Sequence, residues 1–475
     1  MVFSSLVFLC IFFPVVFCLH AAIPSTKARN AILIAASLFF YAFGEPVYVA
    51  LMAASAFLNY LCALLIDAVG SGKKKAVLAV AATANIGILC VFKYAGFFVA
   101  TVESMLHLGL KAPQVTLPIG ISFFTFQALS YVIDVYRGQV EVQKNFGKVL
   151  LYISFFPQLI AGPIVKYRDI ALEIDSRSVT LGETALGLRR FICGLAKKIL
   201  IANTMAVAAD HVFQQGAASL DMLGAWVGAA AYTMQIYYDF SGYSDMAIGL
   251  GQMFGFHFRE NFEHPYGSLT IKEFWRRWHI SLSSWFREYV YIPLGGNRKG
   301  KFRTGLNKVI VFFLTGLWHG ANWTFVAWGL FHGAFSFLEE AVPAIKKLPR
   351  AVLHIYTMLV VTVGFVIFRA DTLGQAFSFL GKMFTGFQFT AGSLSFAVQQ
   401  LTPFFLAMLA AAVAGCAPLS RLSLRLREAS EQEGELAPKE NFVQAALYLA
   451  AFVLLLWCII RLSGGSYNPF IYFRF

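Results

Sequence analysis

"VIVFFLTGLWHGANWTFVAWGLFHGAFSFL", residues 309–338, is a run of 30 residues without aspartate, glutamate, lysine or arginine. About 20 apolar residues are enough for a helix to cross a bilayer. The run nevertheless contains His319, with Gly316 and Gly320 beside it. A polar side chain is costly in apolar surroundings, and ionisable residues inside membranes usually mark a substrate path. The run therefore predicts a membrane-embedded helix with a functional histidine.

The composition of the whole chain extends this interpretation. Of 475 residues, 58% are hydrophobic and only 13% are charged, and the mean hydropathy is +0.66. Soluble domains carry about 25% charged residues. We therefore expect an all-α polytopic membrane protein, a helical bundle of about ten to twelve membrane elements with re-entrant and interfacial helices. It forms one integral-membrane domain over residues 1–475, in which residues 418–440 are a polar loop.

The basic residues predict the orientation of the chain. Lysine and arginine exceed aspartate and glutamate by 38 to 25, giving a net charge of +13. Short cytoplasmic loops collect such an excess, so we assign it to topology and to no nucleic-acid partner. Lys27 and Arg29 follow the first apolar segment, and "GKKK" at 72–75 follows the third. Both loops are predicted to be cytoplasmic, which places the N-terminus outside, and the first segment lacks the basic start of a signal peptide.

The spacing of the cysteines is not typical of a disulfide framework. They lie in or beside apolar runs without metal-like spacing, so we expect buried hydrophobic side chains, no disulfide framework and no metal site. The seven positions are Cys10, Cys18, Cys62, Cys90, Cys193, Cys416 and Cys458.

Residues 259–308 hold the densest charge, ten lysines or arginines against four glutamates. They include "FWRRWHISLSSWFREYVYIPLGGNRKG", residues 274–300. As one continuous helix, this segment places its aromatic residues on a single face, which predicts an interfacial helix with that face toward the membrane. The face comprises Trp275, Trp278, His279, Leu282 and Trp285.

The basic residues of this region, called the basic collar below, permit a second interpretation. Arginine recognises phosphate with paired donors. The collar residues Arg276, Arg277, Arg298 and Lys299 then hold a phosphate-bearing donor at the cytoplasmic mouth. The alternative is an interfacial anchor whose long basic side chains reach to the headgroups. His279 is the exceptional member of its face, since a merely structural residue there would more often be apolar.

The depth of His319 follows from helical geometry. If Lys308 marks the cytoplasmic edge, eleven helical residues carry the chain about 16 Å at ~1.5 Å per residue, near the middle of a core about 30 Å thick. Gly316 and Gly320 allow a backbone or a ligand to approach closely. His319 is then a general base near neutral pH, or a neutral imidazole that ties two helices together.

A further polar run, "YYDFSGYSDMAIG" at 237–249, crosses apolar sequence. Its carboxylates need partners. They orient an imidazole, coordinate water or bridge to arginines. The residues concerned are Asp239, Ser241, Tyr243, Ser244 and Asp245. His332 lies thirteen residues beyond His319, too far along one helix to share its site.

Four motifs together resemble the membrane-bound O-acyltransferases. They read "YYDFSGYSDMAIG", "EFWRRWHISLSSW", "YIPLGGNRKG" and "GLWHGANWTFVAWG". The chain is most similar to the bacterial branch of this family that serves the O-acetylation of alginate and peptidoglycan. The resemblance covers essentially the whole chain, and the four motifs in combination are highly specific.

This resemblance implies a helical membrane fold with a tunnel, in a bacterial inner membrane. The family histidine falls on His319 and the second motif position on His279, with Trp278, Trp318 and Asn322 among the supporting motif residues. The implied reaction takes acetyl from acetyl-CoA, a substrate and not a bound cofactor, on the cytoplasmic side. The acetyl group reaches a hydroxyl of an extracytoplasmic polysaccharide, directly or through an exported partner acetyltransferase.

Several alternatives stay open at this point. His319 either deprotonates the acceptor hydroxyl or is itself transiently acylated. Within the family, D-alanyl transfer to teichoic acid from a carrier-protein thioester is a competing chemistry. A permease that moves acetyl groups without chemistry is a third function.

Overall fold

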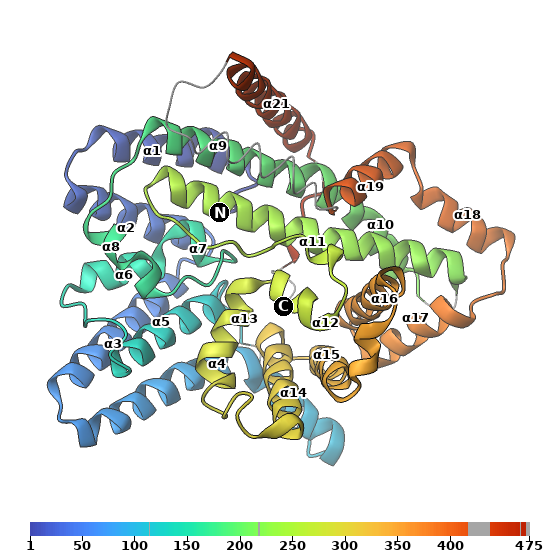
Figure 1. The fold of residues 1–475 in the computed structure, drawn as a ribbon, viewed down its shortest axis with the longest axis horizontal. Coiled ribbons are helices and arrows are strands. Elements are labelled where there is room, and N and C mark those ends of the chain that lie inside the picture. Colours follow the sequence, from blue (N-terminus) through green and yellow to red (C-terminus); the bar gives the residue numbers. More distant parts are fainter. Residues whose placement is uncertain (114, 217–218, 417–437, 466, 472–475) are drawn as a thin grey trace. The chain divides into compact units, whose positions relative to one another are not determined.

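The computed structural model describes residues 1–475 except 114, 217–218, 417–437, 466 and 472–475, and every regular element in this part is a helix (Figure 1). The all-α prediction is thus confirmed. The predicted polar loop 418–440 lies outside the described residues, apart from residues 438–440, with which α21 begins.

The chain divides into two compact units. The first comprises Met1–Phe191 and Met246–Arg259, and the second comprises Ile192–Asp245 and Glu260–Phe475. Two helices, α9 (Leu181–Ala196) and α11 (Met222–Met253), contribute residues to both units.

The first unit is built from apolar helices. In it α3, α4 and α5 pack on one another, and α2 packs on α6. Asn59 of α3 and Asn85 of α4 exchange side-chain hydrogen bonds of 3.1 and 2.8 Å, which satisfies two buried amides. The elements are η1 (Phe8–Phe12), α1 (Phe13–Ala22), α2 (Thr26–Ala42), α3 (Tyr48–Ala68), α4 (Ser71–Leu106), α5 (Ile121–Tyr136), α6 (Phe146–Ser154), α7 (Phe156–Leu159) and α8 (Tyr167–Asp175).

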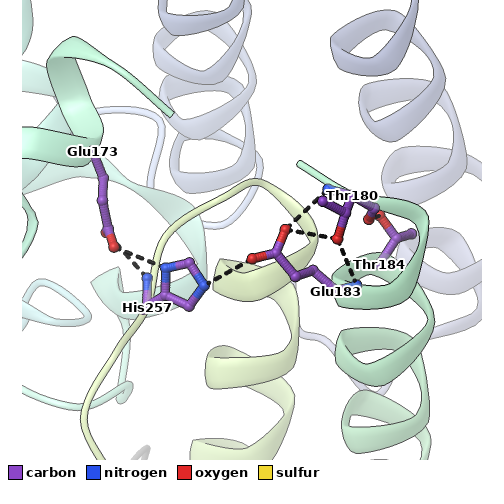
Figure 2. A network of polar contacts seen from close by, with 5 residues as sticks. All are labelled: Glu173, Thr180, Glu183, Thr184 and His257. Atoms are coloured by element: carbon purple, nitrogen blue, oxygen red, sulfur yellow. Dashed lines mark hydrogen bonds and ion pairs between the residues drawn. The ribbon is translucent and has the colours of Figure 1, made fainter. Parts of the chain in front are cut away.

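A polar network links α8, α9 and the segment after α11 in this unit (Figure 2). His257, which follows α11, contacts Glu173 of α8 at 2.8 Å and Glu183 of α9 at 3.5 Å. Glu183 also accepts a hydrogen bond from the backbone N–H of Thr180, and the Thr180 hydroxyl accepts one from the backbone N–H of Glu183. This reciprocal pair is a capping box that starts α9. The network therefore ties three segments together through one histidine.

The second unit contains both predicted histidines of the site. Its core is rich in aromatic residues packed between α11, α12, α15 and α16. The remaining elements are η2 (Lys197–Ala202), α10 (Asn203–Gln214), η4 (Pro265–Gly267), α12 (Ile271–Arg277), α13 (Ile280–Phe286), η5 (Arg287–Tyr291), α14 (Gly300–His319), α15 (Trp323–Ala341), η6 (Pro343–Lys347), α16 (Arg350–Arg369), α17 (Leu373–Thr385), α18 (Ala391–Gln400), α19 (Pro403–Cys416) and α21 (Pro438–Ser463).

The uncharged run 309–338 forms two helices and not one. Helices α14 and α15 turn back on each other and pack along their length (Figure 1). A Cβ atom at Gly316 would lie 2.3 Å from the carbonyl oxygen of Phe325, and one at Gly329 would lie 2.3 Å from that of Phe312. These glycines are needed because the two backbones touch. Of the two predicted uses of Gly316, backbone or ligand, the structure therefore selects the backbone.

The described helices support a multi-pass membrane protein. Five are long and apolar enough to cross a bilayer, and a sixth span results if α18 and α19, bent by 62°, count as one. The first predicted span forms a shorter helix, Phe8–Ala22. The expected ten to twelve elements include re-entrant and interfacial helices as well as spans, and several apolar runs form such shorter helices. The five spans are Tyr48–Ala68, Ser71–Leu106, Leu181–Gln214, Arg350–Arg369 and Phe442–Ser463.

The cysteine prediction needs a correction. Cys62, Cys416 and Cys458 are buried, but Cys10, Cys18, Cys90 and Cys193 are exposed. An apolar segment implies burial only in water, since a membrane protein also turns apolar side chains outward to lipid.

Candidate active site

His279 lies at a break between two short helices. The predicted continuous helix over 274–300 is wrong, because α12 ends at Arg277 and α13 begins at Ile280. His279 adopts left-handed backbone angles, φ 44° and ψ 55°, which are uncommon for a residue other than glycine and often accompany functional sites. Two aromatic residues of the predicted membrane face, Trp278 and Trp285, are instead buried inside the protein, with 5% and 4% of their surface exposed.

Asn261 holds this break in place. Its Oδ1 accepts hydrogen bonds from the backbone N–H and the hydroxyl of Ser281, at 3.2 and 2.9 Å, and faces Nδ1 of His279 at 3.2 Å. Its Nδ2 donates to the Ser244 hydroxyl at 3.0 Å. Because the backbone donor fixes Oδ1 as an acceptor, Nδ1 of His279 must be the protonated nitrogen, and Nε2 carries the lone pair.

The environment of His279 keeps its imidazole neutral. The side chain is 1% exposed, and Phe240 packs edge-on against it at 4.6 Å between ring centroids. Burial lowers the pKa of His279 to about 3. Its Nε2 has no hydrogen-bond partner among the described residues. A buried lone pair of this kind is available to a bound molecule.

His319 is the last residue of α14 and sits within an aromatic cluster. The helix runs unbroken from Gly300, so the eleven residues after Lys308 are helical as predicted. The imidazole packs edge-on against Trp318, Trp328 and Phe368, at centroid distances of 5.0, 5.1 and 5.2 Å. The side chain is buried, 8% exposed.

Trp318 joins the two histidines. Its ring lies 6.0 Å from that of His279 and 5.0 Å from that of His319. A cavity of about 20 Å³, large enough for one water-sized group, borders His319. The residues that line this small cavity are Ile236, Phe240, Trp278, His319, Trp328, Phe365, Phe368 and Ile471.

A second cavity of about 930 Å³ lies beside α12 and α13. Arg276 and Arg298 of the predicted collar line this large cavity. Arg277 and Lys299 do not line it. Arg277 pairs with Glu273 at 2.6 Å, and Lys299 is the exposed N-cap of α14. Three further cations, Lys272, Arg287 and Lys308, also border this space.

Two tryptophans separate the large cavity from the small one. Trp275 lines the large cavity and packs on Trp328, which lines the small one, at 5.5 Å. The indole N–H of Trp275 donates to Nδ1 of His332 at 3.4 Å. The prediction that His332 lies far from His319 assumed one helix. Because the chain turns between α14 and α15, the Trp328 ring contacts both histidines, with ring centroids 5.3 Å from His332 and 5.1 Å from His319.

The polar run 237–249 does not meet the histidines through its carboxylates. Of the predicted alternatives, bridging is closest, but the partners are lysines of η2: Lys198 lies 2.7 Å from Asp239 and Lys197 lies 2.6 Å from Asp245. Ser241 is buried. Tyr243 stacks on Phe470 at 4.9 Å.

Asn322 is a helix cap in this structure. Its Oδ1 accepts from the backbone N–H of Thr324 at 3.1 Å, and its Nδ2 donates to the carbonyl oxygen of Asp371 at 2.9 Å. It therefore shapes the turn after His319 and does not line either cavity.

Sequence reasoning missed Asn261 and Ile471. Asn261 precedes "FEHPYG", a loop with no periodic pattern, and Ile471 is more than a hundred residues from every motif. The burial of Asn261, which reveals its role, is seen only in the structure. No local signal marks Ile471, because only the fold brings it beside His319.

Comparison with known proteins shows the family of the chain. The family model of the membrane-bound O-acyltransferases (MBOAT) matches residues 141–370, which include both histidines. The chain is 41% identical to the probable alginate O-acetylase AlgI of Azotobacter vinelandii over 100% of both chains. It is 36% identical to the peptidoglycan O-acetyltransferase of Helicobacter pylori over 81% of this chain and 80% of the relative.

A more distant relative is the teichoic acid D-alanyltransferase of Bacillus subtilis, 29% identical over 53% of this chain and 67% of the relative. The similarity extends over the full chain for the probable alginate O-acetylase and over 81% of it for the peptidoglycan O-acetyltransferase. This chain belongs to the membrane-bound O-acyltransferase family and is a membrane acyltransferase.

Proposed function

We propose that this enzyme transfers acetyl from acetyl-CoA, taken up on the cytoplasmic side of a bacterial inner membrane, to a hydroxyl of an extracytoplasmic polysaccharide. The transfer is direct or passes through an exported partner acetyltransferase. The observation that carries the proposal is the pairing of His319 and His279 around Trp318, beside a water-sized cavity. Alginate and peptidoglycan are the acceptors named for the similar proteins.

The large cavity supports coenzyme A as the carrier of the acyl group. Coenzyme A bears a pyrophosphate and a 3′-phosphate, and arginine binds phosphate oxygens with paired N–H donors. Arg276, Arg287 and Arg298 border a space of about 930 Å³, a volume in the range of ligand sites. The thioester then extends toward Trp275, the residue between the large and small cavities.

The proposed chemistry balances without a further reactant. His319 takes the proton from the acceptor hydroxyl, and the oxygen attacks the thioester carbonyl. The carbon–sulfur bond breaks as the oxygen–carbon bond forms, and the departing thiolate receives the proton from the imidazolium, which leaves an ester and free coenzyme A. His279, neutral and with its Nε2 lone pair available, accepts a hydrogen bond from an amide N–H of the pantetheine arm and positions the donor.

The test is coenzyme A release from radiolabelled acetyl-CoA by the purified full-length protein in lipid nanodiscs. We expect turnover once an acceptor polysaccharide and its exported partner are supplied, and none with D-alanyl carrier protein as the donor. Absence of acetyl-CoA turnover under all these conditions would overturn the proposal. Label retained on the protein after denaturation and lost in His319→Ala would replace the general base by an acylated histidine.

The orientation has its own test. Ser71 starts α4 next to "KKK" at 73–75, and we expect that side to be cytoplasmic. Ser71→Cys, in a background with all seven native cysteines replaced, should react with an impermeant maleimide only after lysis. Because four native cysteines are exposed, this background is necessary. Labelling in intact cells would invert the orientation and the side from which the donor enters.

A further inference from the structure

We propose that the segment Tyr467–Ile471 is a wall of the acyl site, and that Ile471 restricts the transferred group to acetyl. This inference rests on the proposed function, since it names the selectivity of the same site. Ile471 is 3% exposed and borders the small cavity together with His319. It is separated from His319 by 152 positions along the chain, so its place there depends on how the segment is held.

A buried ion pair holds the end of this segment that carries Ile471. Lys198 and Asp239 lie 2.7 Å apart with side chains 3% and 1% exposed. Lys198 also donates to the carbonyl oxygen of Pro469, and Asp239 accepts from the backbone N–H of Ile471 at 2.8 Å. Each partner of the ion pair thus also makes a hydrogen bond to the segment. The backbone of Ile471 is fixed from η2 and α11 at once.

Contacts at the other end of the segment repeat this arrangement. The Tyr467 hydroxyl donates to Oδ2 of Asp210 at 2.8 Å, while Arg369 pairs with Oδ1 of the same carboxylate at 2.5 Å. Between the two ends, Phe470 stacks on Tyr243 at 4.9 Å. A segment held at both ends and in the middle presents one fixed side chain to the cavity, as selectivity requires.

The size of the cavity gives the direction of the selectivity. At about 20 Å³ it admits a group of about one water molecule in size, and packed interiors do not expand cheaply to admit an added methylene. Two methylenes on the acyl chain would have to displace the Ile471 side chain or one of the aromatic rings. Ile236 and Ile471 are the aliphatic residues that line the cavity, and either can be shortened without removing an aromatic contact of His319. Of these two, Ile471 is the one whose backbone the buried ion pair holds.

The experiment compares acetyl-CoA, propionyl-CoA and butyryl-CoA as donors for the full-length enzyme. For Ile471→Ala we expect the ratio of kcat/KM for acetyl-CoA to that for butyryl-CoA to fall at least tenfold, because the removed side-chain atoms leave room for the longer chain. Ile471→Val, which removes one methyl, should shift the ratio in the same direction by less. Ile471→Leu, which keeps the number of atoms, should move it least.

The matched control is Ile192→Ala. Ile192 is 5% exposed in the same unit but does not border the cavity, so its truncation should leave the ratio as in wild type. If Ile471→Ala does not fold, Ile471→Val decides the question. An unchanged ratio in Ile471→Val and in any folded Ile471→Ala overturns the inference while acetyl transfer stands. If the wild-type enzyme does not turn over acetyl-CoA at all, the proposed function is overturned instead.

Discussion

The large and small cavities are bordered by residues with opposite physical properties. The large cavity is bordered by exposed cations such as Arg276 and Arg298, whereas the small cavity is closed by aromatic rings around His319. Exposed charges bind phosphates but act weakly through water. A proton transfer gains from a dry site in which dipoles are fixed in advance. Separation of the two regions lets one protein provide both environments.

The two histidines differ in the same way. His279 receives a defined tautomer from Asn261 and has its Nε2 free of protein partners among the described residues. His319 is held by rings on three sides, from Trp318, Trp328 and Phe368. Hydrogen bonding fixes the proton position of the first, and packing fixes the location of the second. This difference supports the proposal of a positioning role for His279 and a proton-transfer role for His319.

The largest expected effect is on the small cavity. His319→Ala should lower acetyl transfer by about a thousandfold, since general-base catalysis contributes roughly 10²–10⁴-fold. Expression and membrane insertion should stay near wild type because alanine is smaller and apolar. Turnover of radiolabelled acetyl-CoA measures the loss. Activity close to wild type would reduce His319 to a helix tie between α14 and α15.

His279→Ala should cost about a hundredfold, and Asn261→Ala about tenfold, because a residue that orients another contributes less than the group that it orients. If His279 positions the donor, its variant should raise KM for acetyl-CoA as well as lower kcat. Ser244→Ala, which removes only the outer hydrogen bond of Asn261, serves as the control. A loss in Ser244→Ala as large as in Asn261→Ala would contradict this order.

The buried ion pair behind the small cavity predicts a stability effect. Lys198→Met leaves Asp239 charged and buried, and removing one partner of such a pair costs about 3–5 kcal/mol. The double variant Lys198→Met, Asp239→Leu should recover most of that loss. Thermal unfolding in detergent measures both. Equal destabilisation by the single and double variants would show that the hydrogen bonds to residues 469–471 matter more than the charges.

The smallest effect belongs to the large cavity. Arg276→Ala with Arg298→Ala should raise KM for acetyl-CoA about tenfold with little change in kcat, since exposed charge-assisted contacts contribute modestly. Added salt should reduce the difference between variant and wild type. Arg277→Ala is the matched control, because Arg277 does not border the cavity, although its ion-pair partner Glu273 does. An equal rise in KM for Arg277→Ala would assign the whole collar to topology.

Much of this site could be predicted because its residues break local rules. His319 and His279 are polar residues within apolar or aromatic patterns, and such exceptions are visible along the chain. The prediction of one continuous helix over 274–300 was wrong because the chain breaks at His279, a predicted residue of the site. Asn261, eighteen residues earlier in the chain, stabilises the left-handed backbone conformation of His279, which no periodicity indicates.

The sequence by itself determined the class of the protein, its membrane environment, its family and the two histidines, because composition, hydropathy and motifs are properties of short stretches. Only the tertiary structure decided which cations border a cavity, which glycines admit a backbone and what stands beside His319. Lys198, Asp239 and Ile471 come from three distant segments. These residues come together through long-range packing and because a buried charge must be paired. No local sequence pattern predicts either of these.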